Sequence, residues 1–196
     1  MAQQLLDDLA LDAIFRTARS RNGWSDAPVA RADLEAIYDL AKMGPTSVNL
    51  SPARFVFIES TEAKQALAAC VSAANAPKIL AAPVTAIIGM ELQFYEKAPQ
   101  LFPHEPTARD WFKGAAVRET AFRNSSLQGA YFMLAARALG FDCGPMSGFD
   151  KAQVDAAFFA GTPVETNFIC ALGKGTEERL FERLPRLPFD EACRMA

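Results

Sequence analysis

Histidine and closely spaced cysteines are nearly absent from this sequence. Its 196 residues include one histidine, His104, and four cysteines that lie far apart and form no CxxC motif. Such a chain lacks the ligand clusters of a zinc centre, so we expect no metal site. Scattered cysteines are typical of reduced thiols in the cytosol. We therefore predict a cytoplasmic protein in which Cys143 serves as a packing residue.

Strong basic character and long apolar runs are also lacking. The formal net charge is −3, and the sequence has no basic stripe of the kind that marks a nucleic-acid surface. No apolar run approaches the roughly 20 residues that cross a bilayer. The acidic, amphipathic start of the chain does not fit a secretory signal. We expect neither a nucleic-acid partner nor a membrane partner.

The usual signatures of enzymes are missing as well. The sequence has no GxSxG, no Walker loop and no GxGxxG that follows a strand, so the common nucleophile and nucleotide motifs are excluded. A Ser-His-Asp triad would depend on His104 alone, which lies in a loop flanked by prolines. Any chemistry then comes from scattered polar side chains or from a cofactor that itself reacts.

Hydrophobic periodicity predicts a single domain over residues 1–196 in which helices and strands alternate. About half of the residues are apolar, which is enough for a core at this length. Helices are expected at 5–18, 31–43, 61–71, 115–139 and 150–159, and strands at 53–59, 83–90 and 166–173. Residues 91–113 follow no period and contain three prolines. We expect them to form a lid or a partner surface rather than core, within an α/β or α+β fold.

Short polar residues gather in a stiff loop between the second predicted helix and the first predicted strand. Two prolines, at positions 45 and 52, bracket Thr46, Ser47, Asn49 and Ser51. Folds that alternate helices and strands commonly bind their ligands at the ends of strands. The loop is therefore a candidate binding segment.

The longest predicted helix carries two amides on its inward face. Its inward stripe consists of Val117, Ala121, Asn124, Gln128, Tyr131 and Ala135. Asn124 and Gln128 are four residues apart, so they lie one above the other. A buried amide without a partner costs about 1–3 kcal/mol. Two interpretations stay open: the amides bind neighbouring backbone or a subunit interface, or they face the edge of a planar heterocycle.

Further segments sketch a site for a flat, phosphorylated ligand. The Gly-Pro loop at 143–150 would present backbone N–H groups to a ligand, because its glycines permit close approach. Asn75 and Lys78 place an amide and a cation on one helical edge. Guanidinium groups, which suit phosphate oxygens, are found at Arg19, Arg21, Arg183 and Arg186. Each segment alone also fits a plain turn or a solvated surface.

A set of motifs occurs in a characteristic order along nearly the whole chain. These motifs are RNGW, MGPTSVNLSPARFVF, FYEKAPQLFPH, ETAFRNSSLQGAY, CGPMSGFD, DAAFFAGT and LFERLPRLPFDEAC. In this order they resemble the nitroreductase family of FMN-dependent oxidoreductases, and more closely its malonic semialdehyde reductases of pyrimidine breakdown. The resemblance implies an α+β fold with a central mixed, mostly antiparallel sheet flanked by helices. It also implies an intertwined homodimer with FMN at the interface.

The resemblance further implies which residues contact FMN. The partner subunit would contribute a loop that faces the isoalloxazine ring, through residues Pro45, Thr46, Ser47 and Asn49. Further contacts to the ring and ribityl chain would come from Asn75, Lys78, Asn124, Pro145, Ser147 and Gly148, with a backbone N–H of the last loop near flavin N5. The phosphate would be bound by the segment Arg19, Ser20 and Arg21, and by Arg183.

Some positions depart from the family pattern. The usual doubled arginine before the serine is a single Arg19 here. The sequence therefore leaves open whether Arg19 or Arg21 reaches the phosphate, and whether Arg186 substitutes for Arg183. Ser147 stands where a glutamate is frequent. We expect the resulting, less acidic pocket to tolerate an aldehyde that carries a carboxylate.

The activity that the resemblance implies is a two-step hydride transfer. NADH or NADPH would reduce FMN, and hydride would then pass from flavin N5 to the carbonyl carbon of malonic semialdehyde, giving 3-hydroxypropanoate. Ser47 and Asn49 are the candidates to polarise the substrate oxygen. The alternatives are a broad-specificity reductase of nitroaromatics, quinones or enals, a non-catalytic flavin-binding protein, and an interaction domain without flavin.

Overall fold

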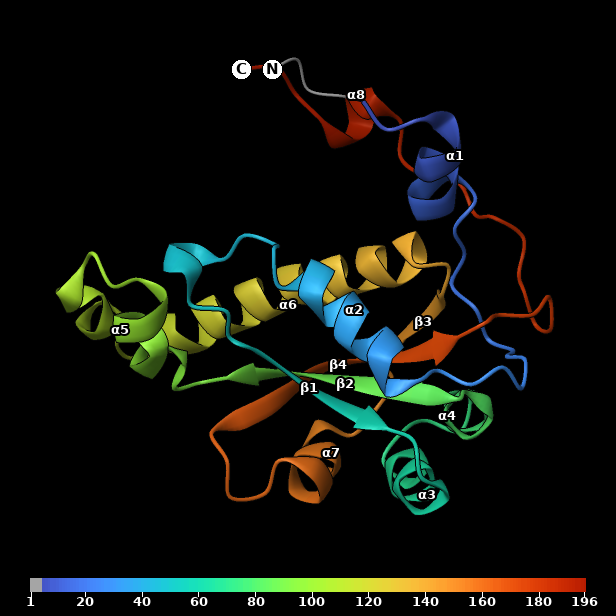
Figure 1. Cartoon of the computed structure of the whole chain (residues 1–196), viewed down its shortest axis with the longest axis horizontal. Helices are drawn as coiled ribbons and strands as arrows, with labels where there is room; N and C mark the ends of the chain where they lie inside the picture. The colour runs from blue at the N-terminus through green and yellow to red at the C-terminus, as the bar shows by residue number, and fades with distance from the viewer. Residues whose placement is uncertain (1–4) are drawn as a thin grey trace.

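The computed structural model describes residues 5–196 and is built around a four-stranded sheet (Figure 1). Residues 1–4, which belong to the acidic start of the chain, lie outside the described residues. In the order β1-β2-β4-β3, the strands are Ala53–Ile58, Val84–Glu91, Val164–Gly173 and Asp142–Met146. All three ladders are antiparallel, and parallel pairing within 5–196 is limited to an isolated bridge between Ser20 and Cys143. The predicted α+β class is confirmed.

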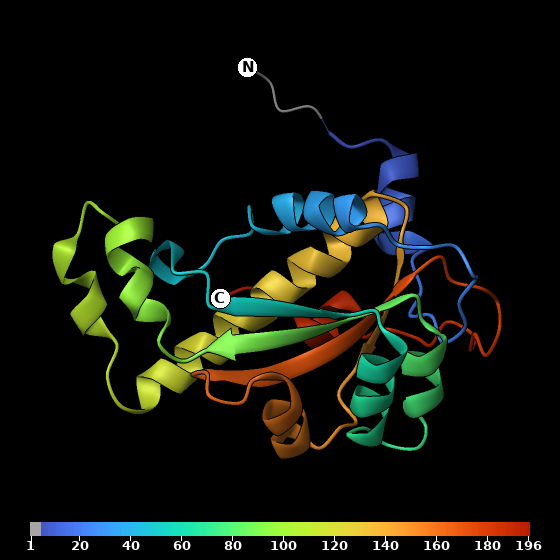
Figure 2. The same ribbon diagram turned by 60° about the horizontal axis from the view of Figure 1, so that its bottom comes forward.

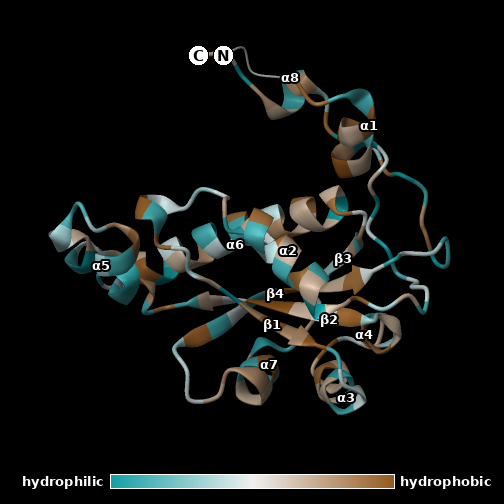
Figure 3. Ribbon diagram, in the orientation of Figure 1, coloured by the Kyte–Doolittle hydropathy of each residue, from teal (hydrophilic) through white to brown (hydrophobic). Residues whose placement is uncertain are grey.

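Helices cover both faces of the sheet (Figures 1 and 2). One face carries α2 (Arg31–Ala41) and α6 (Ala115–Ala138), and the other carries α3 (Thr61–Ala69), α4 (Ala76–Ala81) and α7 (Lys151–Phe158). Strand side chains alternate between the faces, so Ile88 packs into the core with α2 and α6, while Ile87 packs with α3, α4 and α7. Both faces of the central strands are therefore buried, and Figure 3 shows their hydrophobic character.

Residues 91–113 form a small helical unit with its own core. The unit contains η3 (Phe94–Lys97), α5 (Ala98–Leu101) and η4 (Pro106–Trp111). Its buried cluster consists of Leu50, Met90, Phe94, Ala98, Ala108 and Ala121. The prediction that this segment contributes no core is wrong, because its aromatic and small residues pack on one another and on the start of α6. A role as a lid stays a prediction.

Strand β3 occupies part of the segment that was predicted to be a loop. Residues 142–146 pair with 169–173 of β4, and the loop begins only at Ser147. Pro145 lies opposite Cys170 in this outer strand. Proline is tolerated at the edge of a sheet because the ladder on the outer side needs no N–H from it. The proline and glycines hid this strand in the sequence.

The remaining predicted elements are confirmed to within a few residues, except at the start of the chain. The helix expected at 5–18 is shorter: α1 (Asp8–Leu11) is followed by a π-helical turn, η1 (Asp12–Arg16). This helix and α8 (Phe189–Ala192) lie away from the sheet (Figure 1). Large exposed apolar side chains in these end segments include Leu5, Leu9, Phe15, Phe181, Leu184 and Leu187. Such surface is typical of an interaction site.

The described residues also bear on the predicted absences. No helix within 5–196 is long and apolar enough to cross a membrane. Across the same residues, His, Cys, Asp and Glu side chains form no group of three or more that would hold a metal ion. Cys143 is fully buried in the core beside α2 and α6, which is the packing role predicted for it.

Candidate functional site

Two segments from opposite ends of the sequence lie side by side at one end of the sheet (Figure 1). The chain before α2 runs along the chain that follows β4. Nη2 of Arg183 donates a hydrogen bond to the carbonyl oxygen of Ala18 (2.8 Å), and Arg19 donates to the carbonyl oxygen of Phe181. These bonds bring together Arg19 and Arg183, the two residues that the resemblance assigned to the same phosphate.

A cavity of about 600 Å³ opens between these two segments, and we name it the basic cavity. Its cationic lining consists of Arg19, Lys78, Arg137, Arg183 and Arg186. Ser20 and Pro145 also line it, and Glu182 is the one carboxylate among its described lining residues. Positive charge concentrated in a cavity attracts anions, and guanidinium forks match phosphate oxygens. The cavity therefore fits the phosphorylated end of a ligand.

Arg21 does not line the basic cavity. Its Nη1 donates to Oε1 of Glu177 (2.8 Å) and to the carbonyl oxygen of Thr176 (3.2 Å), and its Nε lies 3.5 Å from Oδ1 of Asp142. The hydrogen bond to Glu177 raises the pKa of Arg21 above its ordinary value. Of the two arginines that the sequence left open, the structure brings Arg19 to the cavity and uses Arg21 to hold the chain after β4.

Strand β3 borders the basic cavity, and the loop that follows it holds Asn75. Pro145 lines the cavity together with Lys78. The carbonyl oxygen of Gly148 accepts hydrogen bonds from Nδ2 of Asn75 (3.1 Å) and from the backbone N–H of Ser72 (2.9 Å). The approach is close, because a Cβ on Gly148 would lie 3.0 Å from the Asn75 amide nitrogen. The sequence-predicted residues of α4 and of this loop therefore form one unit.

Ser147, in the same loop, lines a second cavity of about 380 Å³. Two cations also line it, but both are paired: Oε1 of Glu165 accepts from Arg118 (2.6 Å) and its Oε2 accepts from Lys151 (2.6 Å). Lys151 also binds Asp155 (2.7 Å). Burial raises the pKa of Glu165, but the hydrogen bonds from Lys151 and Arg118 outweigh it and hold that pKa below the ordinary value. Because its charges are balanced, this cavity is a weaker anion site than the basic cavity.

The loop at 45–52 is strained, and Pro45, Ser47 and Asn49 in it are exposed. Val48, Asn49 and Ser51 have φ angles of 42°, 55° and 42°, a left-handed conformation that costs non-glycine residues about 1–3 kcal/mol each. The loop is held by Oγ1 of Thr46, which accepts from the N–H of Ser51 (3.1 Å). In addition, Nδ2 of Asn49 donates to the carbonyl oxygen of Leu101 (2.9 Å). Strain of this kind is concentrated at functional sites.

The two amides of α6 hold neighbouring backbone, one of the two interpretations that the sequence allowed. Asn124 is 2 % exposed, and its Oδ1 accepts from the backbone N–H of Ser47 (2.8 Å). Oε1 of Gln128 accepts from the N–H of Ala53 (2.8 Å). Tyr131, which was expected on the same inward stripe, is 38 % exposed. In this chain Asn124 therefore fixes the loop rather than facing an open cavity.

Loss of the hydrogen bonds that the Asn124 side chain makes to this loop and to α6 is expected to make the protein less stable. The Asn124→Leu variant removes the acceptor for the Ser47 N–H and the donor to the carbonyl oxygen of Thr120 (2.8 Å). We expect a loss of about 1–3 kcal/mol in the free energy of unfolding, measured by urea denaturation. Arg123→Ala, on the exposed side of the same helix, serves as the control and should change stability by less than about 0.5 kcal/mol. Equal losses in the two variants would contradict the assignment.

Most of the predicted site residues fall into two groups within one chain. Arg19, Ser20, Lys78, Pro145 and Arg183 line the basic cavity. The loop at 45–49 and Asn124 are not part of that lining. Figure 1 shows the loop near the unit that contains α5, whereas the segments around Arg19 and Arg183 lie at the opposite end of the sheet. A single chain does not bring the two groups together.

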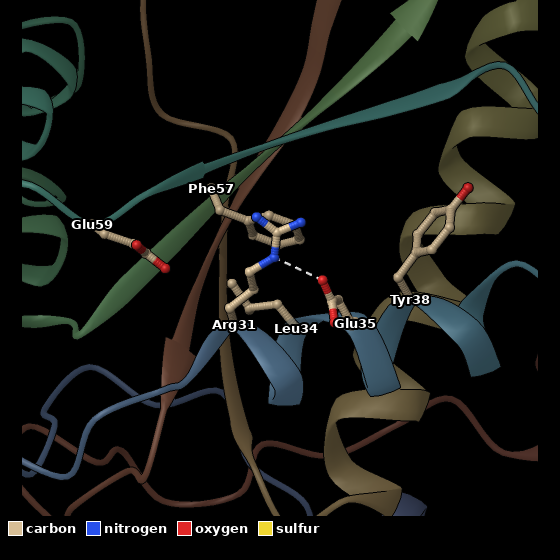
Figure 4. A pocket seen from close by; sticks show the side chains of 6 residues that line it. All are labelled: Arg31, Leu34, Glu35, Tyr38, Phe57 and Glu59. Carbon is tan, nitrogen blue, oxygen red and sulfur yellow. Dashed lines mark hydrogen bonds and ion pairs between the residues drawn. The ribbon is translucent and has the colours of Figure 1, made fainter.

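A further pocket of about 440 Å³ lies between α2 and the outer strand β1 (Figure 4). Its lining consists of Arg31, Leu34, Glu35, Tyr38, Phe57 and Glu59. Nε of Arg31 donates to Oε1 of Glu35 (2.7 Å), and both residues belong to α2. It contains none of the residues that the sequence predicted for the site.

Arg137, in the last turn of α6, is the cationic lining residue of the basic cavity that the sequence analysis missed. An arginine at this position ordinarily interacts with the helix dipole and with solvent. Nothing in its sequence neighbourhood distinguishes it from other surface arginines. Only the packing of α6 against β3 and the N-terminal segment reveals that it reaches the cavity.

Comparison with known proteins supports the family resemblance that the order of the motifs indicated. The sequence model described as "Nitroreductase family" matches residues 16–174. The chain belongs to the nitroreductase family. A relative from Ralstonia pickettii, provisionally named NADH dehydrogenase/NAD(P)H nitroreductase HadB, is 56% identical over 192 residues, which cover 96% of this chain and 98% of the relative. A Caulobacter protein with the same provisional name is 58% identical over 191 residues, covering 97% and 98% of the two chains.

Solved structures share the nitroreductase fold. The ydfN nitroreductase structure from Bacillus subtilis matches with a TM-score of 0.86 and 21% identity, covering 97% of this chain and 100% of that chain. A nitroreductase from Exiguobacterium sibiricum, described as a complex with FMN, matches with a TM-score of 0.83 and 20% identity over 100% of both chains. The structure of the enone reductase CLA-ER matches with a TM-score of 0.83 and 18% identity, covering 97% and 99%. These likenesses establish the fold of the family member described here.

Proposed function

We propose that this nitroreductase-family protein is an FMN-dependent NAD(P)H oxidoreductase whose basic cavity holds the FMN phosphate. The observation that carries the proposal is the convergence of cationic side chains from both ends of the chain, α4 and α6 on that one cavity. A phosphate monoester has about two negative charges near neutral pH and oxygens that accept several N–H donors. Arg19, Lys78 and Arg183 would hold it, with Ser20 donating a further hydrogen bond.

We propose in addition that the active unit is a homodimer of this domain (residues 1–196), acting in the cytoplasm. The exposed loop at 45–49 and the basic cavity lie apart in one chain, so a second copy would be needed to bring the loop to the flavin. The apolar side chains exposed in the end segments support the same arrangement, because they have too little contact with their own chain. In each of the two flavin sites of the dimer, Asn75 would hold the loop at Gly148 in position for the isoalloxazine ring.

The residues of this chain would orient reactants, and FMN, when bound, would supply hydride transfer. Asn124 sets the orientation of Ser47: its Oδ1 accepts a backbone N–H and its Nδ2 donates to a carbonyl oxygen, so the amide has one allowed orientation. Nδ2 therefore also donates to Oγ of Ser47 (3.3 Å). The hydroxyl hydrogen of Ser47 is left free to donate to a substrate oxygen. Asn49, whose amide is bound to Leu101, is the weaker candidate for this role.

For the substrate we propose malonic semialdehyde, reduced to 3-hydroxypropanoate in uracil and pyrimidine catabolism. The aldehyde carbon would receive hydride and its oxygen a proton. Ser147, which stands where a glutamate is frequent in the family pattern, adds no negative charge to the second cavity, and this supports a substrate with a carboxylate. The second candidate is a broad-specificity reductase of nitro compounds, quinones or enals, which the names of the curated relatives favour. A third candidate is a flavin-binding protein without catalysis.

An anaerobic visible spectrum tests these candidates together. We expect the FMN-loaded protein to be yellow, to bleach with NADH or NADPH, and to regain its colour when malonic semialdehyde is added. Recovery with a nitroaromatic but not with the aldehyde would support the second candidate and overturn the first. Bound flavin that neither nicotinamide bleaches would support the third. A protein that does not bind FMN would overturn the proposed function.

A further inference from the structure

The Arg137 guanidinium lines the basic cavity but has no anionic partner among the described residues. Its Nη1 donates to the carbonyl oxygen of Ile14 (3.3 Å), and no carboxylate within 5–196 forms an ion pair with it. Its Nε is buried and donates no hydrogen bond. The position therefore combines a permanent positive charge, a buried unused donor and an adjacent cavity.

This combination is costly unless a ligand completes it. A buried donor that loses its bond to water and gains none in the protein destabilises the fold, and more so when the group is charged. Attraction to the negative end of α6 compensates part of the charge, but it leaves the Nε–H unsatisfied. An oxyanion in the basic cavity would pair with the charge, because the Arg137 side chain lines that cavity.

The other guanidiniums near the cavity show why Arg137 matters. Arg21 is the second arginine of the N-terminal segment, and it is committed to Glu177 and Asp142. Arg19 and Arg183 approach the cavity from the two paired segments, whereas Lys78 approaches from α4 and Arg137 from α6. Arg137 thus supplies a cationic fork from a direction that the other arginines do not cover.

We propose that Arg137 is a binding residue for the phosphate monoester of the cofactor, and that it supplies the guanidinium which Arg21 withholds. This inference rests on the proposed function, because it takes the phosphate to be that of FMN. Its contribution is to the phosphate and not to the ring, since it reaches the cavity from the last turn of α6. Binding through Arg137 would also tie the ligand to η1, because the same guanidinium holds the Ile14 carbonyl.

The test compares FMN with riboflavin, which has the same ring and no phosphate. For Arg137→Met, we expect the dissociation constant of FMN to rise about 10- to 100-fold, as for the loss of a charge-assisted hydrogen bond. The constant for riboflavin should change less than about threefold. Both are measured by quenching of flavin fluorescence, with circular dichroism to verify folding. Arg137→Lys, which keeps the charge and loses the fork, should lie between wild type and Arg137→Met.

Two results would overturn the inference: an unchanged FMN dissociation constant in Arg137→Met, or equal losses for FMN and riboflavin. If Arg137→Met fails to fold, the same comparison of FMN with riboflavin in Arg137→Lys decides. A wild-type protein that binds neither flavin would overturn the proposed function instead. Inorganic phosphate then tests the inference separately: it should raise the melting temperature of wild type more than that of Arg137→Lys, and equal shifts would overturn it.

Discussion

Replacing Gly144 by alanine is expected to weaken both the fold and the binding of FMN. A Cβ at this position of β3 would lie 2.5 Å from the carbonyl oxygen of Arg21 and 3.1 Å from Cζ2 of Trp24. The N-terminal segment is tied to β3 at this point, because the N–H of Arg21 donates to the carbonyl oxygen of Cys143 (3.0 Å). The clash is with backbone, so the segment must move. We expect a loss of about 1–3 kcal/mol in the free energy of unfolding.

The same movement should displace Arg19, which lies two residues before Arg21 in the displaced segment and lines the basic cavity. We therefore expect FMN affinity to fall about tenfold or more in Gly144→Ala, measured by fluorescence titration at a urea concentration where the variant is folded. Gly114→Ala is the matched control: it has open space and φ +59° at the start of α6. It should cost about 1–3 kcal/mol through backbone conformation alone and leave FMN affinity unchanged. Tight FMN binding by a stable Gly144→Ala protein would refute the account.

Replacing Arg183 by alanine is expected to cause the largest loss of FMN affinity by a single surface substitution. The side chain lines the basic cavity, and its Nη2 also holds the carbonyl oxygen of Ala18 next to Arg19. The variant would lose one side chain that binds the phosphate, and it would hold a second one, Arg19, less firmly. We expect the FMN dissociation constant to rise about 30- to 100-fold, which corresponds to about 2–3 kcal/mol. Isothermal titration with FMN measures it.

Arg31→Ala provides the control for charge alone. Arg31 has a 90% exposed side chain paired with Glu35 and lies in the pocket of Figure 4, away from the basic cavity. The Arg31→Ala variant removes the same formal charge as Arg183→Ala. Its FMN affinity should nevertheless stay within about twofold of wild type, because exposed charges at a distance are screened by salt. If both variants lose affinity equally, the net charge of the protein explains the effect and the assignment of Arg183 fails.

Much of the fold was predictable from periodicity. The longest helix and strands β1, β2 and β4 follow helical or strand spacing over enough residues to dominate local preferences. The missed strand contained proline: β3 has Pro145 in an outer strand. The core of residues 91–113 was missed because short 3₁₀ segments leave no period in the sequence.

The sequence by itself determined the family, the order of the main elements and the residue types available to a phosphorylated cofactor. Only the tertiary structure decided which of those residues meet. The sequence does not distinguish Arg19 from Arg21 as a phosphate-binding residue. The fold brings Glu177 and Asp142 to Arg21 and leaves Arg19 at the basic cavity. Asn124 could have faced a ligand or a backbone, and the fold brings the backbone N–H of Ser47 to its Oδ1. A side chain's partner depends on groups distant in the chain, and their positions follow from strand pairing and helix packing rather than from local spacing.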